Sequence, residues 1–290
     1  MQIFDETRCE LGEGVFWHPE RGQVFWFDIT RKRLHTRTAE GHRSWEFPEM
    51  ISAGGWIDHD HLLIASETGL WRFDLRDGSH ERLVPIEADD DRTRSNDGGP
   101  DPWGGFWLGT MGKKGETGLG TLYRWYRNEL RVLRTKMNIP NAIAFDADRS
   151  LAYVSDTPTH TVWAYTLDKD GWPEGESRVF LDLSDEGLRP DGGTVDSEGR
   201  FWSAPWGLGR VAVYRPAGQF ITAEEVPAAR SSRPAFGGPD LTTLFVTTAQ
   251  EGMDAAARRD EPKAGMTFHG SVTVQGRPAV GVPTPRVVIG

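Results

Sequence analysis

The chain has 290 residues but only one cysteine, Cys9, so an intrachain disulfide is excluded. It has no apolar run of 18 residues, the length that a membrane-spanning helix needs, and no basic-then-apolar segment at its start. Positive net charge is also missing, since the formal net charge is −10 at pH 7. This charge argues against nucleic acid or an anionic membrane as a partner. We therefore expect a soluble cytoplasmic protein and interpret Cys9 as a small packing residue.

Several catalytic signatures are absent as well. The sequence contains no Gly-x-Ser-x-Gly nucleophile motif, no phosphate-binding Walker loop and no dinucleotide fingerprint. His59 and His61 have a spacing that zinc ligands can use, but they lie in an expected turn, so we do not interpret them as a metal site. The chemistry therefore has to come from residues that are scattered along the chain.

Helical periodicity is scarce. No long segment repeats its apolar residues every 3.6 positions, and only residues 249–263 combine several good helix formers. Short runs of alternating aromatic, β-branched and polar residues are frequent instead, for example at 69–75 and 161–167, and this pattern predicts strands. The 34 glycines and 18 prolines suit a fold with many tight turns.

Six small turns, each headed by Asp or His, divide the chain into repeats of 40 to 50 residues. The heads are His18, Asp58, Asp101, Asp146, Asp196 and Asp240. Short strands repeated at this period predict a six-bladed β-propeller, a single all-β domain over residues 1–290. We expect one terminal strand to complete the blade that the other terminus begins. We interpret the turn heads themselves as structural, because Asp caps turns and recurs here in nearly every repeat.

Metal-capable side chains recur at one position of this repeat. Counting five residues back from the turn heads gives Glu13, Ala53, Asn96, Asn141, Asp191 and Ala235. Four of these six carry hard oxygen donors, which suit a divalent cation. The first strand of each propeller blade lines the central channel, so equivalent positions should form a ring at one mouth. The repeat therefore predicts a metal site at that mouth.

Eight motifs also carry a family resemblance. They occupy residues 11–17, 94–98, 106–111, 141–145, 153–157, 189–196, 205–211 and 236–241. In this order the sequence resembles the regucalcin (SMP-30)/gluconolactonase family over almost its whole length. The resemblance implies a six-bladed propeller that holds one divalent cation at the channel mouth. It departs from the family at Ala142, where a glycine usually follows the asparagine.

The resemblance also implies roles for individual residues. Glu13, Asn141 and Asp191 match the metal ligands of the family, and Arg94 and Asn96 match residues that contact substrate. A further acidic residue that contacts substrate in some members corresponds to Glu116, in a loop of variable form. Trp206 is the aromatic residue best placed to stack on a sugar ring.

The implied reaction is hydrolysis of a sugar lactone, an aldonolactone, to the aldonic acid. One divalent cation (Ca, Mg, Mn, Zn or Fe(II)) would polarise the lactone carbonyl and activate water, with Asp191 as the base. Two alternatives stay open: a related propeller hydrolase acting on organophosphates or non-sugar lactones, and a non-catalytic calcium-binding protein. The sequence leaves open the sugar, the ion and the oligomeric state.

Overall fold

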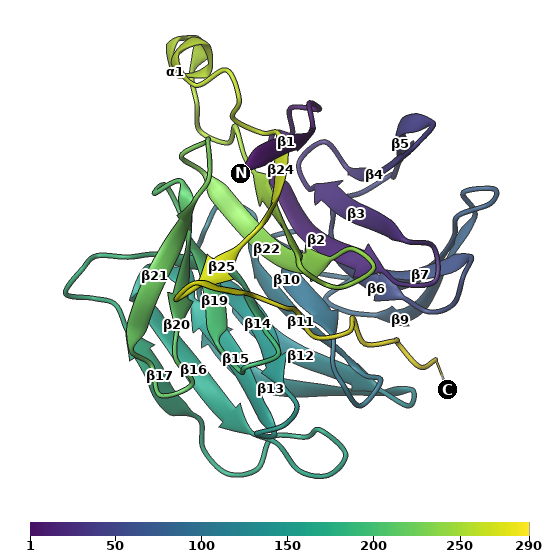
Figure 1. Cartoon of the computed structure of the whole chain (residues 1–290). Helices are drawn as coiled ribbons and strands as arrows, with labels where there is room; N and C mark the ends of the chain where they lie inside the picture. The colour runs from purple at the N-terminus through teal and green to yellow at the C-terminus, as the bar shows by residue number, and fades with distance from the viewer. Residues whose placement is uncertain (290) are drawn as a thin grey trace.

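The computed structural model describes residues 1–289 and consists of six four-stranded antiparallel sheets arranged around a channel (Figure 1). The predicted six-bladed β-propeller is confirmed. Blade 1 contains β2 (Gly12–His18), β3 (Gln23–Asp28), β4 (Arg33–Thr38) and β5 (Gly41–Glu46). Blade 2 contains β6 (Ile51–Trp56), β7 (His61–Ser66), β8 (Gly69–Asp74) and β9 (His80–Pro85). Blade 3 contains β10 (Thr93–Pro100), β11 (Phe106–Gly112), β12 (Gly120–Tyr126) and β13 (Glu129–Met137).

The remaining blades follow in chain order. Blade 4 contains β14 (Pro140–Asp146), β15 (Leu151–Asp156), β16 (Thr161–Thr166) and β17 (Arg178–Asp182). Blade 5 contains β18 (Pro190–Val195), β19 (Phe201–Pro205), β20 (Arg210–Tyr214) and β21 (Phe220–Glu225). Blade 6 contains β22 (Ser231–Gly237), β23 (Thr243–Thr248), β24 (Thr267–Ser271) and β1 (Gln2–Asp5). The first strands of neighbouring blades pack side by side and form the wall of the channel.

The N-terminal strand closes the ring. β1 pairs antiparallel with β24, with Ile3 opposite Phe268, and so supplies the outer strand of blade 6. The expectation that one terminus completes the blade of the other is therefore confirmed. Closure joins the first and last blades of the sheet ring, which would otherwise expose unpaired edges.

Helical structure is short, as the sequence predicts. The stretch 249–263 contains the helix α1 (Ala255–Asp260), whose backbone amides are capped by the Asp254 side chain. It lies in the excursion between β23 and β24 and projects from one end of the molecule (Figure 1). A 3-10 turn, η1, spans Thr157–Thr159. Among residues 1–289, no helix combines the length and apolar character that a membrane crossing requires.

The C-terminal segment crosses the opposite side of the molecule. It follows the small hairpin of β25 (Thr273–Val274) and β26 (Arg277–Pro278) and runs over several blades (Figure 1). The backbone amide of Gly281 donates to Leu241 in blade 6, and that of Val287 donates to Trp56 in blade 2, at 2.8 and 2.9 Å. The segment therefore ties blades together that are far apart in sequence.

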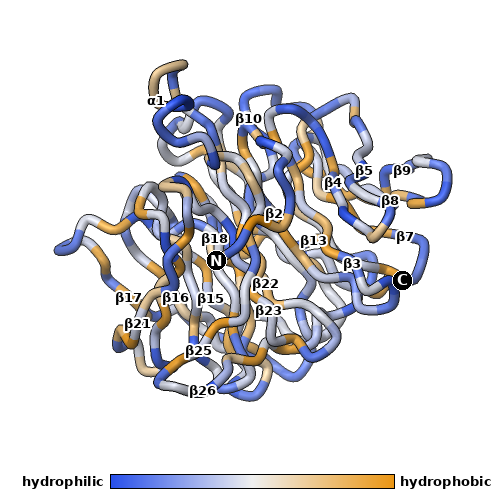
Figure 2. The backbone as a smooth tube through the Cα atoms, turned by 45° about the horizontal axis from the view of Figure 1, so that its top comes forward, coloured by the Kyte–Doolittle hydropathy of each residue, from blue (hydrophilic) through white to orange (hydrophobic). Residues whose placement is uncertain are grey.

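The core lies between the blades and is rich in aromatic residues. Trp26, Trp107 and Trp202 are completely or almost completely buried, each within its own blade. Apolar residues of adjacent sheets interleave, as Phe27 of blade 1 and Phe73 of blade 2 do in one cluster. Figure 2 shows the same division, with apolar residues along the strands and hydrophilic residues in the outer loops. Aromatic burial compensates for the modest overall hydrophobic content.

The turn heads are structural, as predicted. Asp101 accepts hydrogen bonds from the Gly105 amide and, at 2.7 Å, from the buried Arg124 side chain. Asp196 accepts from both the backbone and the side chain of Arg200. Each carboxylate thus closes its own hairpin and holds an arginine, Arg124 on β12 in one case and Arg200 at the end of the turn in the other.

A one-residue register shift interrupts the first strands and corrects one prediction. Glu13 and Asn141 pair with Phe27 and Ser155 just before their shifts. In contrast, Ala53 and Ala235 pair with Ala65 and Phe245, after the register shifts of β6 and β22. Counting back from the turn heads fails in these two blades because Asp58 and Asp240 lie two and three residues beyond the ends of β6 and β22, whereas the other four heads lie at the end of their first strand or one residue beyond it. The two alanines therefore do not belong to the ring of Glu13 and Asn141.

Candidate metal centre and active site

Five of the six predicted site residues line one cavity of about 240 Å³. They are Glu13 on β2, Arg94 and Asn96 on β10, Asn141 on β14 and Asp191 on β18. Each has an exposed fraction of 9% or less, although the cavity itself is open on one side. All five lie near the beginning of a first strand, so the cavity occupies the channel mouth at which these strands start.

A chain of side-chain hydrogen bonds connects three blades across this cavity. The Arg94 guanidinium donates to Asn96 Oδ1 at 2.9 Å, and Asn96 Nδ2 donates to Asn141 Oδ1 at 3.1 Å. Asn141 Nδ2 then donates to Asp191 Oδ1 at 2.7 Å and to Thr157 Oγ1 at 2.9 Å. Buried polar groups that satisfy one another in this way hold defined positions before a ligand arrives.

Two buried carboxyl groups face each other at the end of this chain. Burial raises the pKa of Glu13 to about 7, although the positive charges of Arg233 and Arg94 oppose this effect. Burial also raises the pKa of Asp191 well above its ordinary value, and the negative charge of Glu13 raises it further. Two carboxylates at close range in a poorly solvated place repel each other. A cation between them would offset both the burial of the two negative charges and their mutual repulsion. The donor set therefore fits a divalent metal with oxygen ligands.

The backbone at Glu13 explains how a strand presents this carboxylate. Gly14 follows in the left-handed region at a φ of 59°, within the register shift of β2. A side chain at this position would collide with the Ser52 carbonyl of the next blade and with the Phe27 ring. The Gly14 amide also donates to Glu13 Oε2 at 3.2 Å. Glycine is therefore required here by both conformation and space.

An ion pair beneath the cavity was not predicted from the sequence. Arg233 on β22 pairs with the buried carboxylate of Asp97, and Asp97 Oδ2 accepts from the Ile143 amide at 2.8 Å. Burial lowers the pKa of Arg233 to about 10, while the nearby Glu13 opposes this shift. Arg233 thus brings positive charge close to Glu13. No motif marks it, because its role depends on blade 6 closing against blades 3 and 4.

The predicted substrate contact Glu116 is not brought together with the other five. Within residues 1–289, the lining of the cavity does not include it, and its carboxylate accepts from the Lys114 amide at 2.9 Å. The cavity instead receives Glu251, from the connection after β23, which the sequence did not single out. Trp206 lines the cavity as predicted, and Arg189 contributes a second guanidinium.

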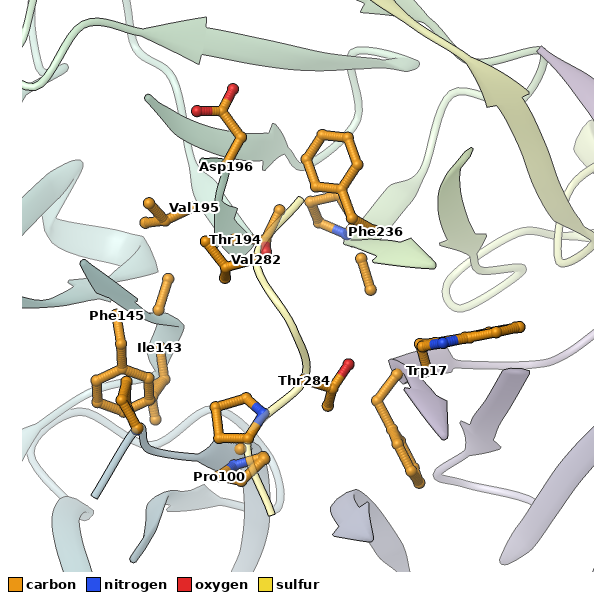
Figure 3. A pocket seen from close by; sticks show the side chains of 18 of the residues that line it. Trp17, Pro100, Ile143, Phe145, Thr194, Val195, Asp196, Phe236, Val282 and Thr284 are labelled. Carbon is orange, nitrogen blue, oxygen red and sulfur yellow. The ribbon is translucent and has the colours of Figure 1, made fainter. Parts of the chain in front are cut away.

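A larger cavity of about 430 Å³ occupies the other end of the channel. Its walls come from the later residues of the six first strands, and Figure 3 shows the segment with Val282 and Thr284 running through its middle. Trp17 and Phe236 lie on one side of that segment, with Phe145 on the other. Its lining is mostly apolar and contains none of the predicted ligands. The smaller cavity is therefore the better candidate for metal chemistry, despite its size.

Cys9, Asp28 and His35 form a second group whose ligand atoms lie within 4.8 Å of one another. All three are buried, Asp28 and His35 on strands of blade 1 and Cys9 in the segment that leads into it. Burial and the Asp28 charge raise the pKa of the Cys9 thiol well above its ordinary value. The Asp28 oxygens accept from the amides of Glu10 and Leu11, at 2.9 and 3.1 Å, and so hold the loop that leads into Glu13. This arrangement supports a structural role.

Comparisons with known proteins agree with this architecture. The SMP-30/gluconolactonase/LRE-like region matches residues 11–250. A 6-deoxy-6-sulfogluconolactonase of Pseudomonas putida is 34% identical, with 92% of each chain covered. A pentonolactonase of Haloferax volcanii is also 34% identical, with 94% of each chain covered. The crystal structure of regucalcin, a calcium-binding protein of Agrobacterium tumefaciens, superposes with a TM-score of 0.95 at 35% identity, covering 99% of this chain and 97% of that one.

Proposed function

Because the chain belongs to the SMP-30/gluconolactonase/LRE-like family, we propose that it hydrolyses a sugar lactone to the aldonic acid at a single divalent cation. The observation that carries this proposal is the facing pair of buried carboxyls, Glu13 and Asp191, within a cavity open to solvent. Relatives that act on a sulfogluconolactone and on pentonolactones support a sugar lactone as the substrate class.

Glu13, Asn141 and Asp191 would hold the cation, and the few protein ligands would leave room for water and substrate. Once bound, the cation would act as a Lewis acid toward the lactone carbonyl and lower the pKa of bound water. The ion itself stays open among calcium, magnesium, manganese, zinc and ferrous iron, because oxygen donors accept several of them.

The side chains would then move one proton and orient the sugar. Asp191 takes a proton from the attacking water as its oxygen bonds to the carbonyl carbon. The tetrahedral intermediate collapses by breaking the bond between that carbon and the ring oxygen. The ring oxygen receives the proton and becomes a hydroxyl, while the new carboxylic acid loses its own proton to solvent. One water is consumed, and one aldonate and one proton are released.

The other polar residues would position the lactone. Arg94 and Asn96 are fixed by their mutual hydrogen bond and present donors and an acceptor to sugar hydroxyls. Trp206 is half-buried in the lining and offers a face on which a sugar ring can stack. Glu116 could join them only if its loop moved toward the cavity on substrate binding. This polar wall favours a polyol over the apolar substrates of an organophosphatase.

The test is proton release from a panel of pentono- and hexonolactones near neutral pH. The protein is stripped with chelator and then supplied with one ion at a time. Turnover above the spontaneous rate, restored by metal, would support the proposal and identify sugar and ion. Tight calcium binding without turnover of any lactone would instead favour a calcium-binding protein. The similarity to regucalcin, a calcium-binding protein, is the reason to include this second function.

A further inference from the structure

Glu251 is the third carboxylate of the site cavity and differs from the other two. It reaches the lining from blade 6, while Glu13 and Asp191 belong to blades 1 and 5. Glu13 and Asp191 are buried, but Glu251 is exposed to solvent. It forms no ion pair with any residue between 1 and 289. Glu251 therefore stands at the rim with its carboxylate free to accept hydrogen bonds.

The backbone on both sides of Glu251 is fixed. Ala249 forms a bridge with Leu11, and the Gln250 amide donates to the Glu10 carbonyl at 2.9 Å. The Gln250 carbonyl accepts in turn from the Met253 amide at 3.0 Å. The short connection is thus attached to the segment that leads into Glu13. The position of Glu251 over the cavity is set by this attachment rather than by its own side chain.

The other charged residues of the lining leave Glu251 as a hydrogen-bond acceptor for substrate. The exposed Arg189 and the buried Arg94 can only donate hydrogen bonds. Glu13 and Asp191 face each other and would be occupied by the cation. A sugar lactone carries several hydroxyls, each of which needs an acceptor when it leaves water. Glu251 is the carboxylate of the lining that remains available for them.

We propose that Glu251 is a specificity-determining residue that accepts hydrogen bonds from the hydroxyls of a neutral aldonolactone and disfavours lactones that carry an anionic substituent. This inference rests on the proposed lactonase function and adds the charge class of its substrate. Its negative charge repels an anionic group at the rim, where removal of Glu251 would leave Arg189 as the charged residue facing solvent. Specificity of this kind combines an attractive contact with a repulsive one.

The experiment compares a neutral hexonolactone with the same lactone phosphorylated at C6. Steady-state constants are measured for the wild type, Glu251→Gln and Glu251→Ala with saturating metal. We expect KM for the neutral lactone to rise about tenfold in both variants, since a charge-assisted hydrogen bond is lost, while kcat changes less than about threefold. KM for the phosphorylated lactone should fall, so that the preference for the neutral substrate shrinks by more than tenfold.

Glu261→Gln serves as the matched control, because Glu261 lies in the same excursion outside the cavity lining and its amide counterpart can still accept from Ala229. It should leave both constants and the preference unchanged. Wild-type turnover with an unaltered preference in Glu251→Gln would overturn this inference alone. Absence of any lactone turnover in the wild type would overturn the proposed function and the inference together.

Discussion

At the scale of single residues, the site depends on two acids that would repel each other without a partner. Glu13 and Asp191 are both almost completely buried, and each shows a raised pKa. Asn141 holds Asp191 by donating to it while accepting from Asn96, and the Gly14 amide donates to Glu13. This arrangement suits the cation that we propose for the site.

Replacing Asp191 by asparagine keeps the size of the side chain and removes its capacity as a base. We expect kcat to fall by at least about 10²-fold, the range associated with loss of a general base. Metal binding should weaken as well, so calorimetry must establish the concentration that saturates the variant. A fall of less than about threefold with metal bound would exclude Asp191 as the base.

The raised pKa of Glu13 predicts an unusual pH dependence of the metal-free protein. Its native pKa of about 7 exceeds the ordinary value of 4.5, so the folded state binds more protons than the unfolded state between these values. The free energy of unfolding should therefore fall as pH rises from about 4.5 to 7, by about 3 kcal/mol.

Urea titrations of the metal-free wild type and Glu13→Gln, at several pH values, test this. The stability difference between the two proteins should change over that pH window in favour of the variant. Saturating metal should reverse the trend, because the cation needs ionised carboxylates. Parallel pH curves for the two metal-free proteins would contradict the assigned burial of Glu13.

At the scale of the strand, register shifts place the proposed ligands at the channel mouth. In β14 the residue after Asn141 is Ala142, which has a φ of 51° and is completely buried. Alanine in the left-handed region is strained by roughly 1–2 kcal/mol. The corresponding residue after Glu13 on β2 is Gly14. Blade 4 thus carries strain that blade 1 avoids.

The substitution Ala142→Gly would relieve this strain, but it would also remove a buried methyl group and increase the conformational freedom of the unfolded chain. The buried methyl contributes about 0.8 kcal/mol, and the extra freedom of an unfolded glycine costs roughly 0.5–1 kcal/mol. These terms nearly cancel the relief of strain, so we expect stability to change by less than about 1 kcal/mol. Denaturant unfolding measures it, with Ala144→Gly on the same strand as the control, which should be clearly destabilising. A loss above about 2 kcal/mol for Ala142→Gly would mean that the strain is absent.

These shifts also mark what sequence can and cannot predict. Glu13, Asn141 and Asp191 recur at one repeat position and match family motifs, so the sequence singled them out, and the structure brings all three into one cavity. Ala53 and Ala235 were wrongly included because a count along the chain does not show where each turn head stands relative to the end of its strand. The sequence did not reveal Glu251 and Arg233, because Glu251 is positioned by the contact of blade 6 with the segment leading into blade 1, and Arg233 by its contacts with blades 3 and 4. Repeats predict strands and blades well, while contacts across the closure depend on three-dimensional packing.

At the scale of the whole molecule, both chain ends contribute to holding the ring together. The N-terminal strand β1 completes blade 6, and the C-terminal segment reaches blade 2 on the side opposite the site. Val287 in that segment is completely buried. The C-terminal segment therefore packs at the mouth of the channel opposite the candidate site.

Ending the chain at Ala279 should accordingly cost stability but not activity. The truncation removes the burial of Val287 and the hydrogen bonds of the segment to blades 2 and 6, so we expect a loss of at least about 2 kcal/mol. The kcat/KM for lactone at 25 °C should stay within about threefold. Val287→Ala should give an intermediate loss of stability. A large fall in kcat/KM with the protein still folded would show that the C-terminal segment also affects the site at the other mouth, and would contradict this prediction.

The most direct test of the central claim is the metal stoichiometry of lactone turnover. Chelator-stripped protein is titrated with the activating ion while proton release and bound metal are followed together. The account predicts that turnover rises with occupancy, reaches its maximum at one equivalent and is lost in Glu13→Gln and Asp191→Asn. Full turnover by the stripped protein, or by variants that no longer bind the ion, would contradict it.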